Sequence, residues 1–176
     1  MNDHAIEIRE APIDSVGELA VVPISFTVTR PGSTPWVKNY DDIPGEGPTQ
    51  WARRFDISRW GFIQARSEHG LVGGAVIAFD TPDLEMLEGR LDLAVLWDIR
   101  VAPDVRRRGI GSRLLLAAEA WAVSRGCREL KVETQDINVP ACRFYERQGF
   151  VLRTVNPDAY PAFPDETQLL WYRDLS

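Results

Sequence analysis

The spacing of apolar residues changes along the chain, and each change predicts an element of secondary structure. Alternating apolar and polar residues predict strands, whereas apolar residues three and four positions apart predict helices. This criterion predicts strands at 5–9, 60–67, 71–79, 93–101, 130–135, 150–155 and 167–172, and a strand or an extended segment at 24–28. It predicts helices at 13–20, 50–55, 110–126 and 138–149. The mixture favours an α/β (α+β) fold, with a long Pro- and Gly-rich loop at 30–49.

The stretch from 93 to 113 carries the most information. Its alternation predicts a strand with one core-facing apolar row, made of Leu93, Val95, Trp97, Ile99 and Val101. Asp98 and Arg100 would then lie on the opposite face, and Pro103 would end the strand because it cannot donate to a β-ladder. A helical pattern begins soon afterwards, at Ile110.

The connection between that strand and that helix is basic and rich in glycine. It holds Arg106, Arg107, Arg108, Gly109 and Gly111. Glycines let backbone N–H groups come close to a ligand, and a helix N-terminus adds unpaired N–H groups and a positive dipole end. The loop therefore predicts a phosphate-binding site, with a basic turn leading into a helix as the alternative. Neither a Walker loop nor a G-x-G-x-x-G motif fits these residues.

Two motifs resemble one known family. The R-x-x-G-x-G sequence at 106–111 is similar to the acyl-CoA loop of the GNAT superfamily of N-acetyltransferases, and 138–150 resembles its N-x-x-A-x-x-F-Y-x-x-x-G-F pattern. The resemblance implies a mixed, mostly antiparallel sheet flanked by helices, with central strands that splay apart to admit acetyl-CoA. It also implies transfer of the acetyl group directly to an amine in a ternary complex.

The same resemblance implies a cofactor site and an acid catalyst. The cofactor-binding candidates are Ile99, Val101, Arg106, Arg107, Arg108, Gly109, Gly111, Ser112, Asn138, Ala141 and Phe144. Tyr145 would protonate the departing CoA thiolate, since a phenol of pKa about 10 can reprotonate a thiolate whose conjugate acid has a pKa of about 8.5. Packing of Tyr145 at the sheet edge is the alternative.

Asp98 is the candidate general base, because strand alternation places it beside the expected thioester position. A carboxylate acting directly or through a water would deprotonate the incoming amine. An ion pair with Arg100, or a charge that only holds a cationic substrate, is the alternative. Glu133 on the next predicted strand is the rival base.

Residues 91–173 resemble the streptothricin-acetyltransferase-like branch of that superfamily. This implies an acceptor pocket that includes Asp98, Glu133, Asp136, Tyr160 and Trp171. Carboxylates and aromatic rings suit a small cationic amine. Acetylation of an aminoglycoside, a polyamine, a protein lysine or an N-terminus stays open, as does a non-catalytic acyl-CoA sensor. Trp36 and Tyr40 would line a substrate mouth or anchor the long loop to the core.

Composition narrows the alternatives. A chain of 176 residues predicts one domain, 1–176, and a net charge of −6 disfavours a nucleic-acid partner. Nothing resembles a signal peptide or a membrane span, so a cytoplasmic protein is expected, with a homodimer left open. Cys127 and Cys142 are expected to be packing thiols. His4 and His69 lie far apart, so no metal site is expected.

Overall fold

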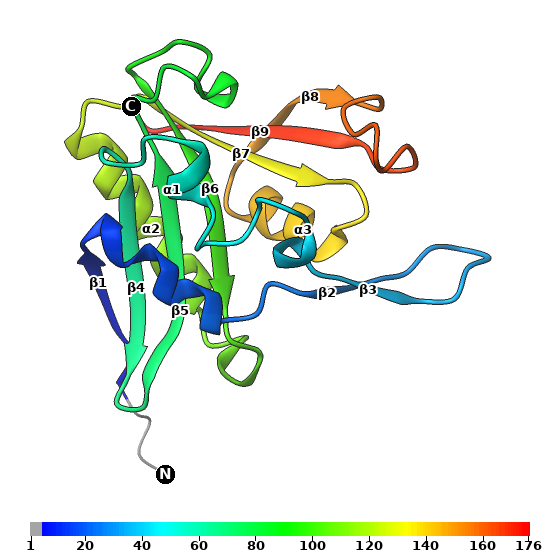
Figure 1. Ribbon diagram of the computed structural model, residues 1–176, viewed down its shortest axis with the longest axis horizontal. Coiled ribbons are helices and arrows are strands. Elements are labelled where there is room, and N and C mark those ends of the chain that lie inside the picture. The colour runs from blue at the N-terminus through cyan, green and yellow to red at the C-terminus, as the bar shows by residue number, and fades with distance from the viewer. Residues whose placement is uncertain (1–4) are drawn as a thin grey trace.

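A seven-stranded sheet with the strand order β1-β4-β5-β6-β7-β9-β8 forms the centre of the computed structural model, which describes residues 5–176 (Figure 1). The strands are β1 (Glu7–Ala11), β4 (Gly61–Ser67), β5 (Gly70–Ala78), β6 (Leu93–Val101), β7 (Glu129–Gln135), β8 (Val151–Asn156) and β9 (Gln168–Asp174). Every neighbouring pair is antiparallel except β6 with β7. The expected mixed, mostly antiparallel sheet is confirmed.

Helices flank this sheet. They are α1 (Trp51–Arg54), α2 (Ile110–Ser124) and α3 (Val139–Arg147), with short 3₁₀ helices η1 (Ile13–Val21), η2 (Tyr40–Asp42), η3 (Glu85–Leu87) and η4 (Pro103–Val105). Helix α2 ends at Ser124, and Gly126, two residues later, has a φ of 81°, the left-handed conformation that commonly follows a helix. The Asn138 side chain begins α3 by accepting a hydrogen bond from the Ala141 N–H at 3.3 Å, and Pro140 occupies its first turn.

Two apolar clusters cover opposite faces of the sheet. On one face α2 contributes Leu114 and Ala118 to a cluster with Ala75 and Ile77 of β5. On the other face η1 contributes buried side chains that pack with Phe62, Val76 and Val95. Because strand residues alternate between faces, β4 and β5 are apolar on both sides and lie at the centre of the molecule.

Strand β6 contains an irregularity that its sequence pattern does not reveal. Asp98 pairs with Val76 of β5, but the next residue of β5, Ile77, pairs with Leu96. Trp97 is therefore an extra residue in β6, which is the arrangement of a β-bulge.

The bulge corrects the expected apolar row. Trp97 packs with the cluster on the η1 side, whereas Ile99 and Val101 pack with the cluster on the α2 side. The prediction of one continuous row was wrong because one extra residue reverses the side-chain alternation. Asp98 and Arg100 consequently lie on the same side as Trp97, and both are buried.

The sheet splits between β6 and β7. The two strands pair only through residues 93–95 and 129–131. Figure 1 shows them diverging from that shared end, so that β1, β4, β5 and β6 form one half and β7, β9 and β8 the other. Beyond the three pairs, the facing edges of β6 and β7 are not bonded to each other, as the expected splay requires.

The long loop predicted at 30–49 is a hairpin in part. Strands β2 (Phe26–Val28) and β3 (Trp36–Lys38) pair antiparallel in a separate two-stranded sheet, which projects away from the main one in Figure 1. The overlooked signal is Pro31-Gly32, a residue pair typical of tight turns, and Gly32 has a φ of 78°.

Candidate active site

A cleft of about 960 Å³ follows the split between β6 and β7. Its wall is built by both strands, by the starts of α2 and α3, and by segments around η2 and the β8–β9 connection. Most of the predicted site residues line it: Asp98, Ile99, Val101, Arg106, Arg107, Gly109, Gly111, Ser112, Glu133, Asn138, Ala141, Phe144, Tyr145 and Tyr160.

Three predicted residues lie outside this lining, namely Arg108, Asp136 and Trp171. The Arg108 side chain is exposed. The Asp136 carboxylate accepts a hydrogen bond at 2.9 Å from the N–H of Thr167, just before β9. Trp171 is buried in the core, and its indole N–H donates to Thr134 Oγ1 at 2.9 Å. Asp136 thus closes a turn and Trp171 packs the sheet.

The predicted phosphate loop leaves a row of backbone amides without acceptors. The N–H groups of residues 107–112 donate no hydrogen bond to any group within residues 5–176. Arg107 and Gly109 have φ values of 66° and 73°, which turn the chain sharply into α2. The Arg106 Nε donates to the carbonyl of Val101 at 3.0 Å and ties the loop to the end of β6. Free amides at a helix start suit an anion.

Tyr145 lies in the cleft with an unengaged hydroxyl. Its ring packs edge to face against Phe144 and Phe150, and the residue is 5% exposed. The hydroxyl makes no hydrogen bond with the part of the chain that the structure describes. Burial, with a smaller contribution from the nearby Asp98 carboxylate, raises the pKa of Tyr145 above its ordinary value. The phenol therefore stays protonated and keeps a proton to donate.

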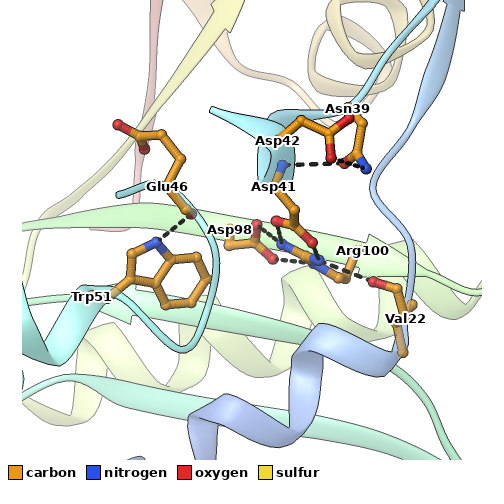
Figure 2. A network of polar contacts seen from close by, with 8 residues as sticks. All are labelled: Val22, Asn39, Asp41, Asp42, Glu46, Trp51, Asp98 and Arg100. Atoms are coloured by element: carbon orange, nitrogen blue, oxygen red, sulfur yellow. Dashed lines mark hydrogen bonds and ion pairs between the residues drawn. The ribbon is translucent and has the colours of Figure 1, made fainter. Parts of the chain in front are cut away.

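Asp98 is held in a buried ionic cluster (Figure 2). Arg100 donates from Nε and Nη2 to the two oxygens of Asp98, at 2.9 Å each. It also donates to both oxygens of Asp41, at 2.7 and 3.1 Å, and to the carbonyl of Val22 at 2.9 Å. These five bonds use all five N–H donors of the guanidinium.

This cluster changes the expectation for Asp98. Burial raises its pKa, and the two hydrogen bonds from Arg100 oppose that rise. Both oxygens of the carboxylate already accept a charge-assisted bond, which stabilises the ionised form. Asp98 thus forms the ion pair with Arg100 that was the alternative to a general base. Asp41 from η2 is a second partner of the same Arg100 side chain.

A chain of hydrogen bonds crosses the other wall of the cleft and ends on Glu133. Asn138 Nδ2 donates to the Tyr40 hydroxyl at 3.3 Å, and that hydroxyl donates to Gln135 Oε1. Gln135 Nε2 donates to the Tyr160 hydroxyl at 3.0 Å, and that hydroxyl donates to Glu133 Oε1. Every donor points the same way, so the bonds polarise one another toward the Glu133 carboxylate.

Tyr40 and Asp41 are cleft residues whose contacts the sequence pattern did not reveal. Both lie in η2, and both line the cleft. Tyr40 contacts Asn138 across 98 positions of sequence, and Asp41 contacts Arg100 across 59. The only signal was the aromatic residue in a long loop, for which anchoring was one of two alternatives.

Cysteine and metal chemistry are poorly supported by the site. Burial raises the pKa of Cys127 to about 11, and it also raises the pKa of Cys142, where Thr134 opposes the rise. Within residues 5–176, no group of three or more His, Cys, Asp or Glu residues could hold a metal ion, and His4 lies outside the described residues. No helix in the same range is long and apolar enough to cross a membrane.

A mixed sheet that splits at one parallel pair, with free amides at a helix start beside the split, defines an N-acetyltransferase fold. The family described as "Acetyltransferase (GNAT) family" matches residues 31–150, and the chain belongs to this family.

Several relatives are similar to this chain. Streptothricin acetyltransferase A of Bacillus subtilis (strain 168) is 41% identical over 81 residues, which cover 45% of this chain and 47% of that protein. The chain thus spans about half the length of that relative. Streptothricin acetyltransferase of Streptomyces lavendulae is 26% identical over 162 residues, 92% of this chain and 82% of that protein. A Bacillus anthracis structure in complex with acetyl coenzyme A has a TM-score of 0.73 at 21% identity, over 97% of this chain and 99% of that one.

Proposed function

We propose that the chain is an acetyl-CoA-dependent N-acetyltransferase that acts on a primary amine of a small cationic molecule, with a streptothricin-like antibiotic as the favoured acceptor. The observation that carries this proposal is the row of free amides at 107–112 beside the split sheet, with the unengaged Tyr145 hydroxyl in the same cleft. The names of the relatives support the choice of acceptor. Residues 1–176 would work as one domain.

The residues present fit acetyl-CoA. The amides of 107–112, with the side chains of Arg106 and Arg107 close by, would hold the pyrophosphate. Asn138 uses one amide hydrogen on Tyr40, so the second is free for the pantetheine arm. The unpaired edge of β6 at 99–101 would offer backbone N–H groups to the acetyl carbonyl. Bound acetyl-CoA would supply the acetyl group as an activated thioester.

Glu133 is the carboxylate best placed to hold and deprotonate the acceptor amine. Five carboxylates line the cleft: Asp41, Glu46, Asp98, Glu133 and Glu166. Four of them form ion pairs with Arg or Lys, and within residues 5–176 Glu133 does not. Its charge is therefore available to an ammonium group, and Asp98 would act instead by positioning Arg100 and Asp41.

Tyr145 would complete the reaction as the acid. As the amine attacks the thioester carbon, the carbon–sulfur bond breaks and its electron pair stays on sulfur. The Tyr145 phenol donates its proton to that thiolate. Cys142 is a poor nucleophile because its raised pKa keeps it as a thiol, so transfer would be direct, without an acyl-enzyme intermediate.

Release of free thiol from acetyl-CoA, measured with an amine panel, tests this proposal. The panel contains streptothricin, an aminoglycoside, spermidine, a lysine peptide and an amine-free blank. Release with streptothricin above the blank supports the proposal. Release only with the peptide moves the function to protein acetylation, and binding of acetyl-CoA without release for any amine leaves an acyl-CoA sensor.

A further inference from the structure

A second cationic site lies in the cleft, and it is occupied by a side chain of the protein itself. The Lys38 ammonium contacts the Glu166 carboxylate at 2.5 Å and lies 4.0 Å from the centre of the Phe163 ring. The Tyr40 ring is 5.9 Å away. Lys38 is only 9% exposed, although it lines the same cleft as Glu133.

The surroundings of this ammonium are those of an ammonium-binding site. A desolvated carboxylate provides charge and hydrogen bonds, and the aromatic faces provide cation–π attraction. These three groups, Glu166, Phe163 and Tyr40, are here called the ammonium cage. The cage is open to the cleft, because all three residues belong to its lining.

The Lys38 side chain that fills the cage belongs to a hairpin outside the main sheet. Lys38 ends β3, whose sheet contains only β2 and β3 and does not pair with the main sheet. Besides the Lys38 ion pair, a bond of 2.5 Å from Arg30 to the carbonyl of Asp165 holds this hairpin to the β8–β9 connection. The Lys38 side chain can therefore leave the cage without breaking a ladder of the main sheet, while Tyr40 stays bonded to Gln135 and Asn138.

The other lysine of the chain provides a contrast. Lys131 is also buried, and it pairs with Glu88 at 3.1 Å and with the carbonyl of Met86 at 2.9 Å. It lies within β7 and outside the cleft lining. Its ion pair joins β7 to the end of η3, and neither Lys131 nor Glu88 belongs to the cleft lining.

We propose that the ammonium cage is a second acceptor subsite, which Lys38 closes in the free protein and which a second ammonium group of the acceptor takes over by displacing Lys38. The proposal rests on the proposed function for the first subsite, where Glu133 receives the amine that is acetylated. The substrate class is then an amine with at least two separated cationic groups. A monoamine would fill the Glu133 subsite and leave Lys38 in place.

Binding of spermidine and of n-butylamine, measured by calorimetry without acetyl-CoA, tests the subsite. Lys38→Met removes the internal competitor, so spermidine should bind about tenfold more tightly while n-butylamine is unchanged. Glu166→Gln removes the attraction and should weaken spermidine binding at least tenfold. Lys131→Met is the matched control, and it should leave both affinities unchanged.

Lys38→Met leaves Glu166 buried without a cation and can unfold the chain; Lys38→Gln, which keeps a hydrogen-bond donor, then takes its place. Unchanged spermidine affinity in the folded Lys38 variant, or in Glu166→Gln, would overturn the subsite. Binding is measured here without turnover. The absence of thiol release for every amine would therefore contradict the proposed transferase activity and leave the ammonium subsite intact.

Discussion

Among single residues, Tyr145 differs from the other tyrosines because its hydroxyl makes no hydrogen bond within residues 5–176. The chain has four tyrosines, and the hydroxyls of Tyr40, Tyr160 and Tyr172 all form hydrogen bonds. Within residues 5–176 no buried side-chain N or O atom lacks a hydrogen-bond partner, so the unbonded Tyr145 hydroxyl is open to the cleft and can meet a ligand there. We expect Tyr145→Phe to lower kcat by about 100-fold, the lower end of the range for general acid catalysis, while the Kd for acetyl-CoA changes less than about twofold.

Thiol release gives kcat for that variant, and titration gives the Kd. Tyr172→Phe is the control, because it removes a hydroxyl that donates to Glu88 outside the cleft. It should lower the free energy of unfolding by about 1 kcal/mol and leave kcat unchanged. Equal turnover in Tyr145→Phe and in the unmodified chain would exclude Tyr145 from the mechanism.

Gly109 allows the anion site to be tested with a matched glycine. Gly109 has a φ of 73° at the start of α2 and Gly126 has a φ of 81° at its end, and an added Cβ would meet nothing within 4 Å at either position. Gly109→Asp and Gly126→Asp should therefore lose similar stability, about 1–2 kcal/mol, from backbone strain.

Only Gly109→Asp places a negative charge beside the free amides, so the Kd for acetyl-CoA should rise at least about tenfold in this variant alone. Titration with acetyl-CoA measures that Kd, and urea unfolding measures the strain. An unchanged Kd in Gly109→Asp would mean that the amides of residues 107–112 do not hold the cofactor.

The sequence identified most of the residues that line the cleft but did not reveal the ionic cluster. Gly109 and Tyr145 belong to short motifs in which the spacing itself carries the chemistry. The prediction that Asp98 and Arg100 share a face with each other was correct. The residue that meets Arg100 there, Asp41, is 59 positions away in the sequence. The spacing of residues along a strand predicts which face a side chain lies on. It does not predict which distant segment of the chain packs over that face.

Among the elements, the pairing of β5 with β6 limits what the central strand can tolerate. A Cβ added to Gly73 would lie 2.7 Å from the carbonyl oxygen of Arg100, which belongs to the backbone and cannot move away cheaply. Gly73→Ala should therefore lower the free energy of unfolding by about 2 kcal/mol or more, and urea unfolding measures this change. Gly47→Ala is the control, since a Cβ there meets nothing within 4 Å; it should change stability by less than about 0.5 kcal/mol.

The predicted elements agree with the structure wherever a regular pattern lasts for several residues. The strands β4 and β5 and the helices α2 and α3 are confirmed. The bulge at Trp97 and the short strand β3 were missed for related reasons. A bulge inserts one residue without interrupting the apolar run, and a three-residue strand is too short to show a period.

For the whole molecule, the critical feature is that the two halves of the sheet meet over only three residue pairs. An ionic cluster reinforces the meeting point. Glu129, the first residue of β7, accepts bonds from Arg90 at 2.9 Å and from Arg153 of β8 at 2.6 Å. The split that opens the cleft would otherwise leave the second half of the sheet weakly joined to the first.

This arrangement predicts how stability depends on pH. Burial alone would raise the pKa of Glu129, but the bonds from Arg153 and Arg90 outweigh it and lower that pKa. The carboxylate is therefore more acidic in the folded chain than in the unfolded one. Its contribution is complete above the ordinary pKa of about 4.5 and is lost as the pH falls through the lowered folded value. Glu129→Gln should cost about 1 kcal/mol at pH 7, and this cost should shrink as the pH falls below the ordinary pKa of the carboxyl group.

Urea unfolding at a series of pH values between 2.5 and 7 measures the difference in free energy of unfolding between Glu129→Gln and the unmodified chain. Glu85→Gln is the control, because Glu85 is exposed and has no ion pair within residues 5–176. Its stability curve should run parallel to that of the unmodified chain. A Glu129→Gln curve that is also parallel, with no convergence in acid, would show that the charge of Glu129 does not join the two halves of the sheet.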